Sequence, residues 1–188
     1  MGEGKHIMAT IRHGQTLLII CFIIYMIWWY RGFRPAISIS RVKGLNGLLL
    51  AITALTGIAG IILSLQAPAE PAVMKIQPIA ILIIGVVGYI ALLLVTGLMF
   101  KRSVTSELLL IVVWTMLEVY VITLLNSAGG LTDTRFGIMC GVIAVAFLGS
   151  MICYCLYYRL EEKAAFYTAM APLVAGIVSM VVLLLMAR

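Results

Sequence analysis

One carboxylate, Glu118, lies in the middle of a long apolar stretch covering about residues 106–125, with no Lys or Arg within a helical turn of it. Placing a carboxylate there costs on the order of 3 kcal/mol. Thr115 and Trp114 precede it by three and four residues, so on a helix a hydroxyl and an indole share its face. This spacing predicts a proton or cation site whose protonation can switch. The alternative is a hydrogen-bonded glutamate that links two helices.

A second candidate feature is Pro172, inside the last apolar stretch of the chain. Proline removes one helical hydrogen bond and frees the carbonyl four residues earlier, that of Thr168, so we expect a kink there. Glu118, Trp114, Thr115, Pro172 and Thr168 together form the predicted substrate or ion pathway. We expect the other hydroxyl residues in apolar stretches, such as Thr96 and Ser179, to bond within their own helix or to a neighbouring helix.

A cationic segment follows the first apolar stretch. It carries Arg31, Arg34, Arg41 and Lys43. Clusters of this kind attract anionic lipid headgroups, so we predict a lipid headgroup site there. Binding of a phosphate-bearing ligand is the more specific interpretation, and a topological role alone is the simpler one.

The apolar stretches lack the residues that several kinds of chemistry require. The two histidines are His6 and His13, both near the N-terminus, which argues against intramembrane haem ligation and against a histidine-based protease site. The four cysteines lie in or near apolar stretches without zinc or redox spacing, so we expect free thiols, no metal site and no cofactor. A lipid-modifying enzyme would need an acid–base pair that Glu118 alone does not supply. The sequence therefore favours a protein that is not an enzyme.

The composition defines the surroundings of these residues. Of the 188 residues, 64% are hydrophobic and 11% are charged, whereas a soluble domain has about a quarter charged. The cations flank apolar stretches instead of forming a stripe, so the net charge of +6 does not indicate nucleic-acid binding. Stretches of about 20 residues span a bilayer as helices. We therefore predict an all-α polytopic transmembrane helix bundle, one domain over residues 1–188, with six spans at about 14–30, 44–66, 76–100, 106–125, 136–158 and 164–187.

The cations also predict orientation. With six spans, five Lys and Arg residues fall on the side of the termini and eight on the side of the first, third and fifth loops. The positive-inside rule then places both termini outside and those three loops in the cytoplasm, in a plasma (inner) membrane. Glycine and proline positions suggest a 3+3 inverted repeat. Gly57 with Gly60, and Gly137 with Gly141, predict close helix packing.

Two functions remain open at this point. The first is a small transporter or channel for an ion or small solute, proton-coupled through Glu118. The second is a non-catalytic membrane subunit, such as a substrate-binding component, of a larger membrane complex. The expected partners are membrane lipids and either further copies of the chain or a partner subunit.

Overall fold

The computed structural model describes residues 3–33, 43–65, 74–100, 105–157, 160 and 162–187. Within these ranges each regular element is an α-helix, and each is long and apolar enough to cross a membrane. The chain is therefore a multi-pass integral membrane protein, and the predicted all-α bundle of six spans is confirmed. The helices are α1 (Glu3–Phe33), α2 (Lys43–Leu65), α3 (Pro78–Phe100), α4 (Thr105–Ser127), α5 (Asp133–Tyr157) and α6 (Glu162–Met186).

The start of α1 differs most from the prediction. The apolar pattern predicts a first span at residues 14–30, whereas α1 covers Glu3–Phe33 and is about 46 Å long at 1.5 Å per residue. The apolar pattern ends at the polar residues before position 14, but a helix can continue through polar residues. The Arg12 guanidinium donates a hydrogen bond to the carbonyl of Ala187 (2.8 Å), so this cation is accommodated on a continuous helix.

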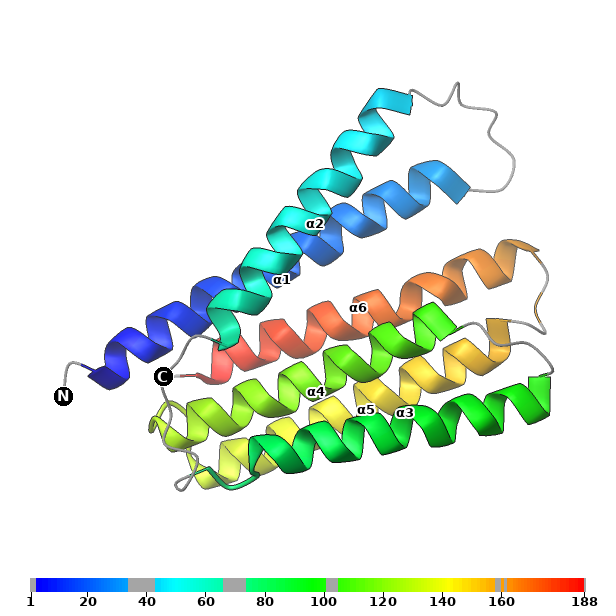
Figure 1. The fold of residues 1–188 in the computed structure, drawn as a ribbon. Helices are drawn as coiled ribbons and strands as arrows, with labels where there is room; N and C mark the ends of the chain where they lie inside the picture. The colour runs from blue at the N-terminus through cyan, green and yellow to red at the C-terminus, as the bar shows by residue number, and fades with distance from the viewer. Residues whose placement is uncertain are drawn as a thin grey trace.

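The helices form a hairpin packed on a four-helix layer (Figure 1). Helices α1 and α2 pack along each other, α1 also lies against α6, and α4 lies among its neighbours α3, α5 and α6. In α4, 56% of the most apolar window is buried, against 28% or less in each of the other five described helices. Helix α4 is therefore the packing centre, and a polar residue in the middle of its buried face, such as Glu118, faces protein and not lipid.

The hairpin is held by close backbone contact. A Cβ atom on Gly14 would lie 2.5 Å from Ser64 Oγ and 2.8 Å from the Ser64 backbone nitrogen, and one on Gly60 would lie 2.8 Å from Leu18. The predicted close packing at Gly57 and Gly60 is confirmed, because a Cβ on Gly57 would meet the Cys21 sulfur at 3.1 Å.

The glycines of α5 behave differently. A Cβ atom on Gly137 or Gly141 would meet no described atom within 4 Å, and both residues are exposed. The prediction that they pack closely against another helix is wrong for the described part of this chain. Their face of α5 lies on the outside of the bundle.

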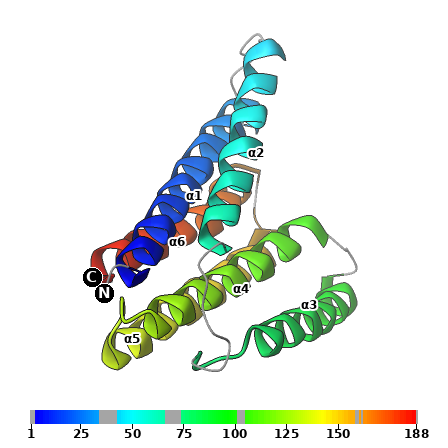
Figure 2. The same ribbon diagram turned by 60° about the vertical axis from the view of Figure 1, so that its left-hand side comes forward.

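One end of the bundle collects the start of α1, the end of α6, residues 74–77 before α3 and the turn before α5 (Figure 2). The Arg135 guanidinium donates to the carbonyl of Met186 (2.7 Å), and the Lys75 ammonium pairs with the Asp133 carboxylate (2.7 Å). These contacts confirm which segments share a side. The assignment of that side to the exterior remains a prediction.

The packing of the two halves does not repeat. In the second half, α5 packs along α6. The corresponding pair of the first half is α2 and α3, and there α3 packs on α4 and not along α2. The contacts therefore give no support to the predicted 3+3 inverted repeat.

Candidate functional site

The Glu118 carboxyl and the Gln15 side chain form a polar pair in the interior of the bundle. Glu118 comes from α4 and Gln15 from α1, the two lie next to each other, and both are 0% exposed. Neither Glu118 oxygen and neither polar atom of Gln15 has a hydrogen-bond partner of good geometry among the described residues. Leaving a buried polar group unpaired costs about 1–3 kcal/mol. We call Gln15 and Glu118 the polar centre.

The other buried polar side chains show how unusual this arrangement is. The hydroxyls of Thr96, Thr123, Ser150 and Ser179 each donate to a carbonyl of their own helix, at 2.7–3.1 Å. Ser64 of α2 is the exception, because its Oγ is buried without a partner beside Gly14, the neighbour of Gln15. Unpaired polar atoms are therefore concentrated where α1 and α2 meet α4.

An aromatic layer lies one helical turn from the polar centre. Trp114 is four residues before Glu118 on α4, is 9% exposed, and its indole nitrogen has no hydrogen-bond partner among the described residues. A Cβ on Gly176 of α6 would lie 2.6 Å from the Phe22 ring and 3.4 Å from the Trp114 ring. Glycine at position 176 thus lets both rings pack against the backbone of α6. We call Phe22, Trp114 and Gly176 the aromatic layer.

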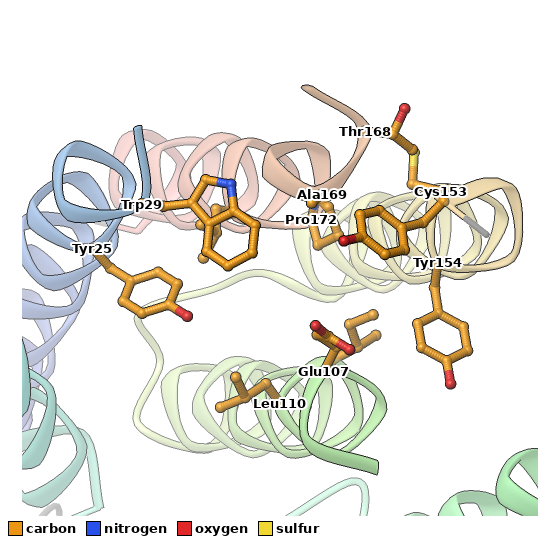
Figure 3. A pocket seen from close by; sticks show the side chains of 12 residues that line it. Tyr25, Trp29, Glu107, Leu110, Cys153, Tyr154, Thr168, Ala169 and Pro172 are labelled. Atoms are coloured by element: carbon orange, nitrogen blue, oxygen red, sulfur yellow. The ribbon is translucent and has the colours of Figure 1, made fainter. Parts of the chain in front are cut away.

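Beyond this layer lies a cavity of about 100 Å³ between α1, α4, α5 and α6. Figure 3 shows the Glu107 carboxyl in its middle, with Tyr25 and Trp29 of α1 to one side and α5 residues to the other. Thr168 and Pro172 of α6 also line it. We call this space the Glu107 cavity.

The spacing along α4 connects the cavity to the polar centre. Glu107, Ile111, Trp114 and Glu118 are separated by four, three and four residues, so they share one helical face. The two carboxylates are 11 residues apart, which is about 16 Å along the axis. Ile111 lines the cavity and Trp114 belongs to the aromatic layer, so these two side chains separate the carboxylates.

The opposite side of the polar centre is closed. A cluster of apolar residues from α1, α4, α5 and α6 fills the space there, and its members on α1, α4 and α6 include Ile11, Val121, Ile122, Leu125 and Leu183, each 1% exposed or less. The Glu107 cavity and this cluster lie on opposite sides of the polar centre along the bundle. On the side of α4 that faces α1 and α6, the open space that approaches Glu118 is therefore the Glu107 cavity.

The predicted pathway residues divide into two groups. Trp114 lies on the side of α4 that faces α1 and α6, whereas Thr115 lines a separate space of about 420 Å³ beside α3, with Gly85 and Phe147. The Thr115 hydroxyl donates to the carbonyl of Ile111 (2.8 Å). The structure thus places Trp114, but not Thr115, with Glu118.

The predicted α6 residues line the Glu107 cavity and not the polar centre. The Thr168 hydroxyl donates to the Ala164 carbonyl (2.8 Å), and α6 continues as a helix through Pro172 from Glu162 to Met186. Both residues therefore lie beyond the aromatic layer as seen from Glu118.

The predicted headgroup site is described only in part. Arg31 is exposed in the last turn of α1, and Lys43 is the first residue of α2. Arg34 and Arg41 lie outside the described residues, as does the side chain of Lys43. Lipid binding at these cations stays a prediction.

Two residues of the site, Gln15 and Glu107, were not predicted from the sequence. Gln15 follows the predicted start of the first span at residue 14 and so resembles an interfacial residue, but α1 begins at Glu3 and carries it into the interior. Glu107 begins the fourth apolar stretch. Its spacing of 11 residues from Glu118, which is close to three helical turns, is the signal that would have placed the two carboxylates on one face.

No protein family model, no curated protein and no solved structure matches this chain.

Proposed function

We propose that this protein transports an ion or small solute across its membrane and that Glu118 carries a proton coupled to that transport. The observation that supports this most strongly is the polar centre, where a carboxyl and an amide lie fully buried against each other and neither makes a hydrogen bond of good geometry among the described residues. A structural glutamate would satisfy its oxygens. An unpaired intramembrane carboxyl is typical of proton and substrate pathways.

The arrangement around the polar centre supports an access route on one side. The Glu107 cavity approaches it from one end, the aromatic layer lies between them, and the apolar cluster closes the other end. A transporter that alternates its access needs one open and one closed side at a time. The proposed cycle begins from a state open toward Glu107, with the aromatic layer as the barrier that must rearrange.

The experiment is a proton-flux measurement in liposomes that contain the purified protein and an entrapped pH-sensitive dye. A panel of Na⁺, K⁺, a small organic cation and a neutral solute is added outside under an imposed pH gradient. We expect at least one solute to move protons with wild type and none to do so with Glu118→Gln. Thr123→Val, a buried change one turn away on α4, should keep the wild-type flux. Equal flux in Glu118→Gln at every pH would refute the proposal.

A second candidate, a membrane subunit of a larger complex, is favoured by the outer face of α5. Gly141 and Gly149 line an open groove of about 570 Å³ with Ala175 and Val178 of α6, and no described side chain covers these glycines. Small residues of this kind let another helix approach closely. Purification in mild detergent distinguishes the two functions, because a stoichiometric partner protein would support the subunit and its absence would support the transporter.

A further inference from the structure

The Glu107 cavity has walls of a distinctive chemistry. Aromatic side chains come from two helices, Tyr25 and Trp29 from α1 and Tyr154 and Tyr157 from α5, and the carboxyl comes from α4. Glu107 is close enough to both Tyr25 and Tyr154 for its charge to act on them. The cavity therefore combines several π surfaces with one negative charge, and Figure 3 shows the Glu107 carboxyl between the two sets of rings.

Among the described residues that line the cavity, none carries a positive charge to offset Glu107. None of the twelve lining residues is Lys or Arg, and within the described ranges Glu107 forms no ion pair. Its place in the first turn of α4 supplies only the partial charge of a helix N-terminus. A cationic guest would balance the carboxylate.

The lining selects between kinds of cation. Ca²⁺ and Mg²⁺ require six or more oxygen ligands, waters included, and here one carboxyl is accompanied by three phenol hydroxyls and the Thr168 hydroxyl, which donates to the Ala164 carbonyl, among rings and aliphatic groups. Ammonium groups with attached carbon atoms instead bind to the faces of Trp and Tyr rings. The aromatic and apolar surface thus favours an organic cation over an inorganic one.

The volume limits the size of the guest. At 10–15 Å³ for each water, a cavity of about 100 Å³ has room for roughly seven waters. A cation with a similar number of non-hydrogen atoms fits, such as a tetramethylammonium or hydroxyalkyl-trimethylammonium ion. A larger planar or lipid-like cation would extend out of the cavity on the exposed side of Glu107.

We infer that the Glu107 cavity binds a small organic cation of the alkylammonium class and that this cation is the transported solute. The assignment of the cation as cargo rests on the proposed transport function, whereas its binding does not. Glu107 holds the charge, and Trp29 and Tyr25 hold the alkyl groups. The aromatic layer separates the bound cation from Glu118 on the same face of α4.

The test is equilibrium binding of radiolabelled tetramethylammonium to the full-length protein in mild detergent. We expect saturable binding that unlabelled choline displaces and that 3,3-dimethylbutan-1-ol, the uncharged carbon analogue of choline, does not. Glu107→Gln should weaken binding at least about 10-fold, and Trp29→Leu about 5- to 30-fold. Tyr167→Leu removes an exposed aromatic residue of α6 that does not line the cavity, so it controls for general effects.

Three results would overturn the inference. They are the absence of saturable binding to wild type, unchanged binding in Glu107→Gln, and equal displacement by the uncharged analogue. Thermal unfolding of each variant shows whether it is folded, and Glu107 is exposed enough for glutamine to be tolerated.

Different results refute proton coupling through Glu118 and cation binding in the Glu107 cavity. If wild type binds no tetramethylammonium while Glu118→Gln abolishes proton flux, the cation site is rejected and proton coupling stands. If tetramethylammonium binds through Glu107 while Glu118→Gln transports normally, proton coupling is rejected and the cation site stands.

Discussion

Replacing Glu118 with methionine should make the protein more stable while it abolishes transport. Methionine has the same number of side-chain heavy atoms in its unbranched stem as glutamate and is larger by about one methylene, and its flexible thioether adapts to irregular cores, so we expect packing to be largely preserved. The substitution removes a 0% exposed carboxyl whose two oxygens lack hydrogen-bond partners among the described residues. Removing one such group recovers about 1–3 kcal/mol. At about 2–4 °C per kcal/mol for a chain of this size, the melting temperature should rise by about 2–12 °C.

The assay is thermal unfolding in mild detergent, followed with a maleimide that becomes fluorescent on reaction with thiols. Cys21 is buried, the other three cysteines are partly buried, and none of the four forms a disulfide, so thiol reactivity reports loss of structure. Thr123→Val is the matched control. Thr123 is equally buried on α4, but its hydroxyl donates to the Val119 carbonyl (2.7 Å). The free energy of unfolding of Thr123→Val should therefore differ from that of wild type by less than about 1 kcal/mol.

A lower melting temperature for Glu118→Met than for wild type would contradict this prediction. It would mean that the carboxyl makes stabilising hydrogen bonds and joins helices, which is the structural role that the sequence left open.

The remaining predictions concern packing and one helix end. Gly14→Val should destabilise the protein by about 1–3 kcal/mol, because its Cβ would lie 2.8 Å from the Ser64 backbone nitrogen, which cannot move aside freely. The Cβ atom added by Gly137→Ala would meet no described atom within 4 Å, so the free energy of unfolding should rise by about 0.5–1 kcal/mol in the same assay. A fall in the free energy of unfolding would contradict the exposed position of that face of α5. Arg12→Gln removes the hydrogen bond to the end of α6 and should cost about 0.5–1.5 kcal/mol, whereas Arg31→Gln, on the exposed end of α1, should change the melting temperature little.

The six spans and the burial of Glu118 could be predicted from the sequence. Apolar stretches long enough for a bilayer have one stable backbone conformation there, the helix, so composition alone determines the fold class. Glu118 lies far from either end of its stretch, and neither water nor a nearby cation can reach it along its own helix. Its burial at 0% exposure therefore follows from its position.

The buried neighbour of Glu118, Gln15, could not be predicted. Gln15 reaches the interior only because α1 extends back to Glu3, and hydropathy carries no information about a helix that continues through polar residues. The sequence predicts both Trp114 and Thr115 beside Glu118, since the two residues flank it on opposite sides of its helical face, and it does not tell which of them faces α1 and α6. The positions of α1 and α6 decide it in favour of Trp114, and those positions depend on tertiary packing at residues such as Gly60 and Gly176.

If Glu118 is the carboxyl through which protons pass, blocking it chemically must stop proton flux. Wild-type protein in liposomes can be treated with dicyclohexylcarbodiimide, which reacts with protonated carboxyl groups in apolar surroundings, and one sample divided between mass spectrometry and the proton-flux assay. We expect an adduct on Glu118 and a loss of flux in proportion to the fraction modified. Complete modification of Glu118 with undiminished flux would contradict its role in proton transfer.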